Sequence, residues 1–191
     1  MKRFEAIRLL RDALPADCLV TACNGMIGRE LFSAGDRSAY FYMMGSMGLT
    51  ASIGLGLALT QPSRTVLTLD GDGNVLMGLA TLASIAAAGV SNFYHVVLDN
   101  VCHGSTGAQP TISDRVHLER IALAAGYRWA RRAETTDEFK HELELFFGGP
   151  GPRLLLVSVG PENRPGIGRV GIKPPDLANR FKQAATGKVP S

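Results

Sequence analysis

Two clusters of polar residues, each at the end of an apolar run, are the strongest indication of chemistry in this chain. Gly71-Asp72-Gly73 follows the run TVLTL at 65–69, and Asp99-Asn100 follows the run FYHVVL at 93–98. A carboxylate and an amide oxygen are suitable ligands for Mg²⁺, which often completes its octahedral shell with the phosphates of a ligand. The two glycines allow the main chain to approach an anion closely. The pattern predicts a site for magnesium and a diphosphate.

The apolar runs that precede these clusters have the length of buried strands, and the segment between them has the length of a helix. We expect parallel strands at 65–69 and 93–98, joined by a helix over 74–89. In a right-handed crossover both strands end at the same edge of the sheet, so Asp72 and Asn100 can share one ion. The start of the helix would direct free N–H groups toward the diphosphate. An ordinary Asp-Gly turn is the alternative interpretation of the first cluster.

Strand and helix patterns alternate along the rest of the chain. This order is typical of an α/β protein, and it predicts a doubly wound parallel sheet with helices on both faces. The helix expected at 136–147 would have Thr136 or Asp137 as its cap. We expect further strands at 18–23 and 153–159, and further helices at 1–14, within 43–60, and at 117–126, 136–147 and 176–185.

Length and composition are those of one folded domain. The chain has 191 residues, 46% of them hydrophobic, which is enough for a full α/β core. We expect a single domain over 1–191, with a proline-rich C-terminal arm over about 160–191. The net charge of +3 is small and the basic residues are scattered, so no nucleic-acid partner is indicated.

The sequence shows no sign of export or membrane insertion. Charged residues interrupt segment 1–14, which therefore does not look like a secretory signal. The uncharged run 43–60 is rich in glycine, serine and threonine, which favours a tightly packed helix over a membrane span. Three cysteines give no disulfide framework. We expect a cytoplasmic protein with no membrane partner.

A further glycine pattern near the C-terminus does not support a function. Gly166, Gly168 and Gly171 have the G-x-G-x-x-G spacing of a dinucleotide-binding fingerprint. Such a fingerprint must follow a strand directly and open a helix, whereas prolines separate this one from the strand expected at 153–159, and Pro174-Pro175 follow it. We therefore reject a dinucleotide site here.

The two polar clusters resemble the thiamine diphosphate motif of a known family. Gly71-Asp72-Gly73 followed by Asp99-Asn100 is similar to the motif of the diphosphate-binding (PP) domain in 2-oxoacid decarboxylases, although that family has Asn where this chain has Asp99. The similarity covers about 18–183 and implies the thiamine diphosphate-binding fold of a PP-type domain. The segments that narrow the resemblance to sulfopyruvate and phosphonopyruvate decarboxylases are FYMMGSMG at 41–48, ASIGLGLAL at 51–59 and HGSTGAQPT at 103–111.

The resemblance implies that thiamine diphosphate and Mg²⁺ are the cofactors. Asp72 and Asn100 would bind Mg²⁺ through their side chains, and Cys102 through its carbonyl oxygen. Met47 matches a bulky apolar residue that holds the two rings of the cofactor in a V shape, whereas without the resemblance a methionine here would be interpreted as core packing. The residues expected to contact the cofactor are Asn24, Gly45, Ser46, Met47, Gly71, Asp72, Gly73, Asn74, Asn100, Ser105 and Thr106.

A thiamine diphosphate enzyme also needs a glutamate that activates the cofactor, and in this family the glutamate lies on a separate pyrimidine-binding (PYR) domain. The length of this chain leaves no room for such a domain. We therefore expect a hetero-oligomer in which a PYR-domain α-type subunit supplies the glutamate and this chain is the β-type subunit. The implied reaction is decarboxylation of a small anionic 2-oxo acid, 3-sulfopyruvate or 3-phosphonopyruvate, to an aldehyde and CO₂.

His103 is the candidate for catalytic proton transfer, because histidine titrates near neutral pH and this one follows Asn100 on the same loop. A loop histidine that only forms hydrogen bonds is the alternative. Arg29 and Arg37 are candidates for binding the anionic group, and the choice between sulfonate and phosphonate stays open. Other functions with the same motif are a catalytically silent regulatory subunit, a carboligase and the β subunit of a 2-oxoacid oxidoreductase. The last is disfavoured because no four-cysteine iron–sulfur spacing occurs in the sequence.

Overall fold

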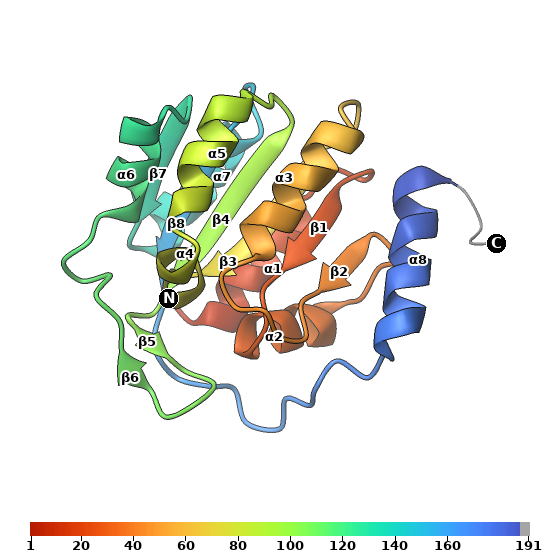
Figure 1. Ribbon diagram of the computed structural model, residues 1–191. Coiled ribbons are helices and arrows are strands. Elements are labelled where there is room, and N and C mark those ends of the chain that lie inside the picture. The colour runs from red at the N-terminus through yellow and green to blue at the C-terminus, as the bar shows by residue number, and fades with distance from the viewer. Residues whose placement is uncertain (188–191) are drawn as a thin grey trace.

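The apolar runs of the sequence form the centre of a six-stranded parallel sheet in the computed structural model, which describes residues 1–187 (Figure 1). The strands of this sheet are β1 (Leu19–Ala22), β2 (Tyr40–Tyr42), β3 (Val66–Gly71), β4 (Phe93–Asp99), β7 (Trp129–Ala133) and β8 (Arg153–Ser158). Their order is β2-β1-β3-β4-β8-β7. β3 and β4 are buried at every position, as expected for parallel strands with helices on both faces.

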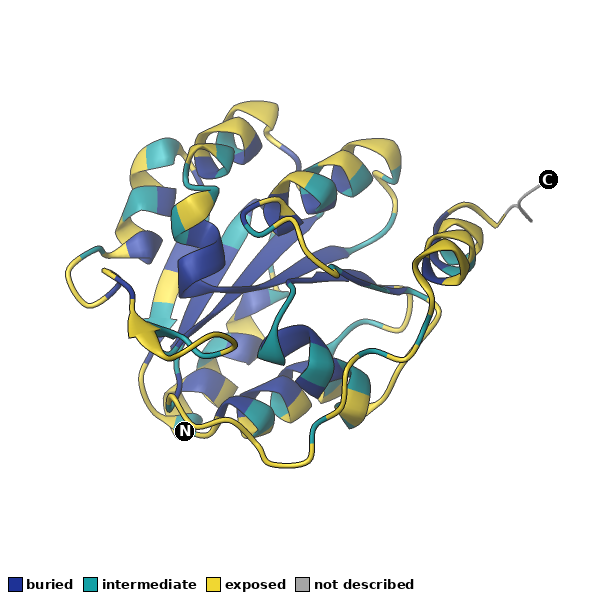
Figure 2. Ribbon diagram, turned by 60° about the horizontal axis from the view of Figure 1, so that its bottom comes forward, coloured by how far each residue is buried: buried dark blue, intermediate teal, exposed yellow. Residues whose placement is uncertain are grey.

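Helices cover both faces of the sheet, and Figure 2 shows the sheet nearly edge-on between the two layers. The helices are α1 (Arg3–Ala13), α2 (Met26–Ala34), α3 (Thr50–Thr60), α4 (Asp72–Met77), α5 (Ala80–Ala88), α6 (Leu118–Ala125), α7 (Thr136–Phe146) and α8 (Pro174–Thr186). α1, α2 and α7 pack into the core on one face. α3, α5 and α6 pack into the core on the other face, and α8 lies beside the edge strand β2 (Figure 1). The expected doubly wound α/β fold is confirmed.

The expected helix over 74–89 is wrong in one respect, because two helices occupy this segment. α4 ends before Gly78, and α5 begins two residues later. Gly48 packs directly against this break, since a Cβ added at Gly78 would lie 2.1 Å from the Gly48 carbonyl oxygen. The loop that precedes α3 therefore fits into the break. Because residues before Thr50 form this loop, only Thr50–Thr60 of the run 43–60 is helical.

Other differences concern helix caps and edge strands. α7 is capped by Thr135, which forms a capping box with Glu138, so neither Thr136 nor Asp137 is the cap. β2 and β7 were not expected from the sequence. β2 has only three residues. β7 has the sequence WARRA, in which two central arginines, one exposed and one half-buried, interrupt any apolar run.

Segments near the carboxyl ends of β3 and β4 enclose the candidate site. A two-stranded hairpin of β5 (Cys102–His103) and β6 (Gln109–Pro110) follows β4. After β8 the chain crosses this edge as an arm over 159–173. The pattern of Gly166, Gly168 and Gly171 lies in this arm, which contains no helix or strand. The last part of the expected arm, 188–191, lies outside the described residues. Among the residues that the structure describes, none of the helices combines the length and hydrophobicity needed to cross a membrane.

Candidate functional site

The loops after β3 and β4 bring three oxygen atoms together at the carboxyl edge of the sheet. The strands end side by side, with Gly71 paired to Leu98. The amide end of Asn100 lies 3.2 Å from Asp72 Oδ1 and 2.8 Å from the backbone oxygen of Cys102. The three residues expected to bind Mg²⁺ are therefore in direct contact.

The chemistry of the donor set shows whether this cluster fits a cation. Asp72 offers a carboxylate oxygen, Asn100 an amide oxygen and Cys102 a carbonyl oxygen. Without a cation, the Asn100 amide nitrogen can donate to the other two oxygens instead. Mg²⁺ binds carboxylate, amide and carbonyl oxygens. The donor set therefore fits Mg²⁺.

Asp72 is buried and is held by two hydroxyl groups that sequence analysis did not identify. Thr111 Oγ1 donates to Asp72 Oδ2, and Ser113 Oγ lies 3.1 Å from the same oxygen. These contacts occupy Oδ2, while Oδ1 faces Asn100. Burial raises the pKa of the Asp72 carboxyl, the Thr111 hydrogen bond opposes this shift, and the charge of Asp99 adds to it.

Asp99 stands where the family motif has Asn, and the structure supplies a partner for its additional charge. Arg132 Nη1 lies 3.7 Å from Asp99 Oδ2, and the other terminal nitrogen of Arg132 lies 3.3 Å from Glu119 Oε2. The other Asp99 oxygen accepts from the Val101 N–H at 3.1 Å and lies 2.8 Å from Ser113 Oγ. A buried carboxylate is stable here because a cation and hydrogen-bond donors surround it.

Gly73 lies where a side chain would close the site. A Cβ at this position would lie 2.5 Å from His103 Cε1 and 3.3 Å from Met47 Cε. The His103 ring and the Met47 side chain thus approach the same small space beside the main chain. A side chain at position 73 would collide with the His103 ring, so the close approach of this ring to the main chain requires glycine.

The side chain of Asn74 is used within the protein. Its oxygen accepts from the Gly48 N–H, and its nitrogen donates to Thr50 Oγ1 at 2.9 Å and to Asp70. Only the main chain of Asn74 is left for contact with a diphosphate. This buried network holds the loop that carries Met47. Sequence analysis did not identify Asp70, whose carboxylate accepts a hydrogen bond from Asn74 in this network.

A cavity of about 130 Å³ opens beside these residues. Gly45 and Ser46 do not line it; both are exposed on the loop before Met47, where Ser46 adopts a left-handed backbone conformation with φ of 53°. The expected site residues that do line it are Asn24, Met47, Gly71, Asp72, Gly73, Asn74, Asn100, Cys102, His103, Ser105 and Thr106. The structure thus brings together segments from four separate loops.

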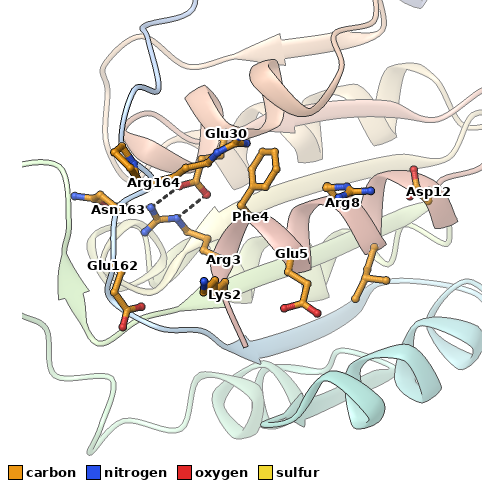
Figure 3. Close-up of a pocket in the computed structure, with 12 residues that line it drawn as sticks. Lys2, Arg3, Phe4, Glu5, Arg8, Asp12, Glu30, Glu162, Asn163 and Arg164 are labelled. Atoms are coloured by element: carbon orange, nitrogen blue, oxygen red, sulfur yellow. Dashed lines mark hydrogen bonds and ion pairs between the residues drawn. The ribbon is translucent and has the colours of Figure 1, made fainter.

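Arg3 lines this cavity and also a larger one of about 700 Å³, which Figure 3 shows. Arg3 and Glu30 form a buried ion pair with two hydrogen bonds, of 3.0 Å and 2.8 Å. Arg3 also donates to Asn163 Oδ1 at 3.0 Å, and Asn163 donates to the Gly104 carbonyl at 2.7 Å. The pair therefore connects α1 and α2 with the arm and with the loop of the smaller cavity.

The cysteines have raised pKa values. Burial raises the pKa of Cys18 to about 12, and it raises those of Cys23 and Cys102 as well. These groups are therefore thiols at neutral pH, which does not favour nucleophilic chemistry. The part of Cys102 that faces Asn100 is its carbonyl oxygen.

Comparison with known proteins gives the same assignment as the motifs. Residues 21–157 match the family described as thiamine pyrophosphate enzyme, C-terminal TPP binding domain. The chain is 40% identical to a phosphonopyruvate decarboxylase of Streptomyces viridochromogenes over 96% of this chain and 46% of that protein. It is 32% identical to sulfopyruvate decarboxylase subunit beta of Methanococcus maripaludis over 96% of this chain and 97% of that subunit. The chain thus spans about half the length of the Streptomyces relatives and nearly all of the archaeal subunit.

Solved structures agree with the fold. Benzoylformate decarboxylase from Polynucleobacter necessarius matches with a TM-score of 0.73 at 17% identity, over 85% of this chain and 34% of that one. A 4-hydroxybenzoylformate decarboxylase from Rhodococcus jostii RHA1 matches with a TM-score of 0.71 at 19% identity, over 86% and 33%. Together with the family match, these findings confirm the resemblance inferred from the motifs. The chain belongs to the thiamine pyrophosphate enzymes, as a C-terminal TPP binding domain.

Proposed function

We propose that this chain is the magnesium- and diphosphate-binding subunit of a thiamine diphosphate-dependent 2-oxoacid decarboxylase. It would form one PP-type domain over 1–191 and work with a PYR domain on a partner chain. The observation that carries the proposal is the convergence of Asp72 Oδ1, the Asn100 amide and the Cys102 carbonyl at the wall of the cavity that Gly73 also lines. This arrangement offers oxygen ligands and room for an anion in the same place.

The residues of the site have distinct tasks in this proposal. Asp72, Asn100 and Cys102 hold Mg²⁺, and the main chain at Gly73 receives the diphosphate. Thiamine diphosphate, when bound, supplies the electron sink that decarboxylation of a 2-oxo acid requires. Met47 supports the rings of the cofactor. The buried side chain of Asn74 accepts a hydrogen bond from the Gly48 N–H and so keeps the loop that carries Met47 in place.

His103 is assigned the proton transfer that completes the reaction. Its ring lies against Gly73, inside the cavity, and the residue is half-buried. A histidine nitrogen can hold a proton at neutral pH and donate it to the carbon from which CO₂ has left. Ser105 and Thr106 form the outer part of the same loop and would limit the access of water to the bound substrate.

The substrate proposed is an anionic pyruvate analogue, 3-sulfopyruvate or 3-phosphonopyruvate. Support comes from the names of the relatives, which are phosphonopyruvate decarboxylases and sulfopyruvate decarboxylase subunits. Both substrates carry a tetrahedral anionic group in addition to the 2-oxo acid. Carboligases and 2-oxoacid oxidoreductases would use the same cofactor site for different products.

The proposed partner would supply the activating glutamate. None of the described residues that line the smaller cavity is a glutamate. Three exposed apolar side chains, Met44, Leu49 and Met77, lie near Met47 and Asn74 in the sequence and are suited to contact with another protein surface. Relatives named subunit beta support a heteromer in which the α-type subunit supplies the PYR domain.

The proposal is tested by purifying the tagged chain from its own host and identifying any accompanying chain by mass spectrometry. We expect a companion with a PYR-domain glutamate, and Mg²⁺-dependent release of CO₂ and an aldehyde from 3-sulfopyruvate or 3-phosphonopyruvate by the complex. A complex that binds thiamine diphosphate but turns over no 2-oxo acid would instead identify a silent regulatory subunit. Condensed products in place of an aldehyde would identify a carboligase.

A further inference from the structure

A second cavity, of about 500 Å³, adjoins the cofactor cavity. The two share Asn24, Gly25 and Ser105 in their walls. The rest of the second cavity is built from the first turn of α2, the loop after β2 and the end of the arm before α8, with Gly28, Arg29, Met43, Met44, Arg169, Val170, Ile172 and Pro174. It therefore lies where a substrate that reacts at the cofactor could extend away from it.

The charges that line this cavity are of one sign. Arg29 and Arg169 are its only ionisable lining residues, and no carboxylate is present in its described wall. Neither guanidinium has an ion pair or a hydrogen bond with another described residue. In contrast, Arg3, Arg132 and Arg180 all pair with carboxylates. The two arginines of this cavity therefore have unused hydrogen-bonding capacity that suits an anion.

The start of α2 adds to the positive potential of the same wall. α2 begins after Gly25, which has a φ of 84° and no side chain to cap the helix, and its first turn contains no acidic residue. The first N–H groups of a helix carry partial positive charge and are normally satisfied by a cap or an anion. Arg29 extends from this helix, so both contributions come from one element.

We infer that Arg29 and Arg169 form the subsite for the tetrahedral anionic group of the substrate, at the end remote from its 2-oxo acid. This inference rests on the proposed decarboxylase function. Arg29 is half-buried on a helix and gives the subsite a fixed cation. Arg169 is exposed on the arm and adds a second cation from a different segment. Arg37, the other arginine considered from the sequence, stacks on Tyr40 and does not line the cavity.

The test uses the complex of this chain with its partner and the variants Arg29→Gln, Arg169→Gln and the double variant. Arg37→Gln is the matched control, and Arg29→Lys keeps the charge without the planar donor pair. The ratio of kcat/KM for 3-sulfopyruvate or 3-phosphonopyruvate to kcat/KM for pyruvate isolates the contribution of the anionic group. We expect each Gln variant to lower this ratio about 10- to 100-fold, as for loss of a charge-assisted hydrogen bond, and Arg37→Gln to leave it unchanged.

A second measurement separates the subsite from the proposed reaction. 3-Phosphonopropionate has the anionic group but no 2-oxo group, so its binding can be measured by calorimetry without turnover. We expect the Gln variants to weaken its binding by the same factor. A wild-type complex that decarboxylates nothing would overturn the proposed function, while this binding experiment would still test the subsite.

Two results would overturn the inference itself. One is an unchanged substrate ratio together with unchanged 3-phosphonopropionate affinity in the double variant. The other is that a Gln variant complex dissociates in size-exclusion chromatography while the fraction that stays assembled keeps the wild-type ratio, which would show that the arginines bind acidic side chains of the partner. Thermal unfolding monitored by circular dichroism would show that the variants remain folded.

Discussion

Two cavities share Arg3 but differ in how their polar groups are satisfied. In the larger cavity, of about 700 Å³, Arg3 is paired with Glu30, and the Arg164 guanidinium lies 4.0 Å from the centroid of the Phe4 ring (Figure 3). In the smaller one, of about 130 Å³, the Asp72 carboxylate and the Cys102 carbonyl face the Asn100 amide, and no described cationic side chain forms an ion pair with Asp72. The larger volume of a cavity is therefore not evidence that it is the binding site.

The physical basis of this difference is the cost of burying polar groups. In a buried ion pair with two good hydrogen bonds, each charge is balanced by the other, so no ligand is needed to neutralise them. A buried carboxylate without a cationic side chain beside it can instead be paired with a bound cation. We therefore propose that the smaller cavity holds the cofactor and that the larger one is structural.

The largest effect is expected from removing a carboxylate of the smaller cavity. Asp72→Asn keeps the shape of the side chain but removes its charge, so Mg²⁺ loses its anionic ligand. We expect Mg²⁺-dependent binding of thiamine diphosphate to the complex to weaken more than about 100-fold, since loss of a residue that merely supports a metal ligand already costs about 10- to 100-fold. Calorimetry with and without Mg²⁺ measures this. Asp114→Asn, an exposed carboxylate outside the cavity, should have no effect, and equal affinities for both variants would remove Asp72 from the site.

The next largest effect concerns stability and the larger cavity. Arg3→Met leaves the buried Glu30 without a partner, which should lower the free energy of unfolding of the chain by about 3–5 kcal/mol. The double variant Arg3→Met/Glu30→Leu removes both charges and should recover part of this loss. Urea unfolding followed by circular dichroism measures both.

Arg164 provides the control for this cavity, because it contacts Phe4 from an exposed position. Arg164→Ala should lower the free energy of unfolding by only about 0.5–1 kcal/mol, the value of an exposed cation–π contact. If Arg164→Ala abolished binding of substrate, the larger cavity would be part of the functional site and the comparison would fail.

A third prediction concerns the proton that His103 is proposed to transfer. His103→Ala should lower kcat about 100-fold or more, as loss of a general acid does, and leave the affinity for thiamine diphosphate unchanged. His103→Gln retains a hydrogen-bond donor but cannot transfer a proton at neutral pH. Normal turnover of the Gln variant would show that the histidine only forms hydrogen bonds, which is the alternative considered from the sequence.

The sequence was sufficient for the parts of the site that depend on parallel strands. Asp72 and Asn100 each follow an apolar run, and parallel pairing of β3 with β4 brings the ends of these runs together. The break between α4 and α5 was missed, although Gly78 is visible in the sequence, because only the packing of Gly48 shows why the helix must end there.

Contacts between distant segments could not be predicted from one sequence. Arg3 and Glu30 belong to different helices, and Arg29 and Arg169 approach the same cavity only because the arm returns across the sheet edge. Such pairs have no local spacing that identifies them. Ser113 is similar, because it reaches Asp72 only through the hairpin that follows β4.

Ser113 also gives the smallest and most specific of the expected effects. Its hydroxyl lies between the carboxylates of Asp72 and Asp99, at 3.1 Å and 2.8 Å, and Ser113→Ala removes a donor while leaving every proposed metal ligand in place. We expect the Mg²⁺ concentration needed for half-maximal binding of thiamine diphosphate to rise about 10- to 100-fold, as for other residues that orient metal ligands. Ser84→Ala, on the exposed face of α5, is the matched control. A rise in that concentration with unchanged kcat at saturating Mg²⁺ would mean that Ser113 orients Asp72 and takes no part in the reaction. An unchanged concentration would mean that the Thr111 hydrogen bond and burial are enough to hold the carboxylate, and the contrast between the two cavities would then depend on Asn100 and Cys102.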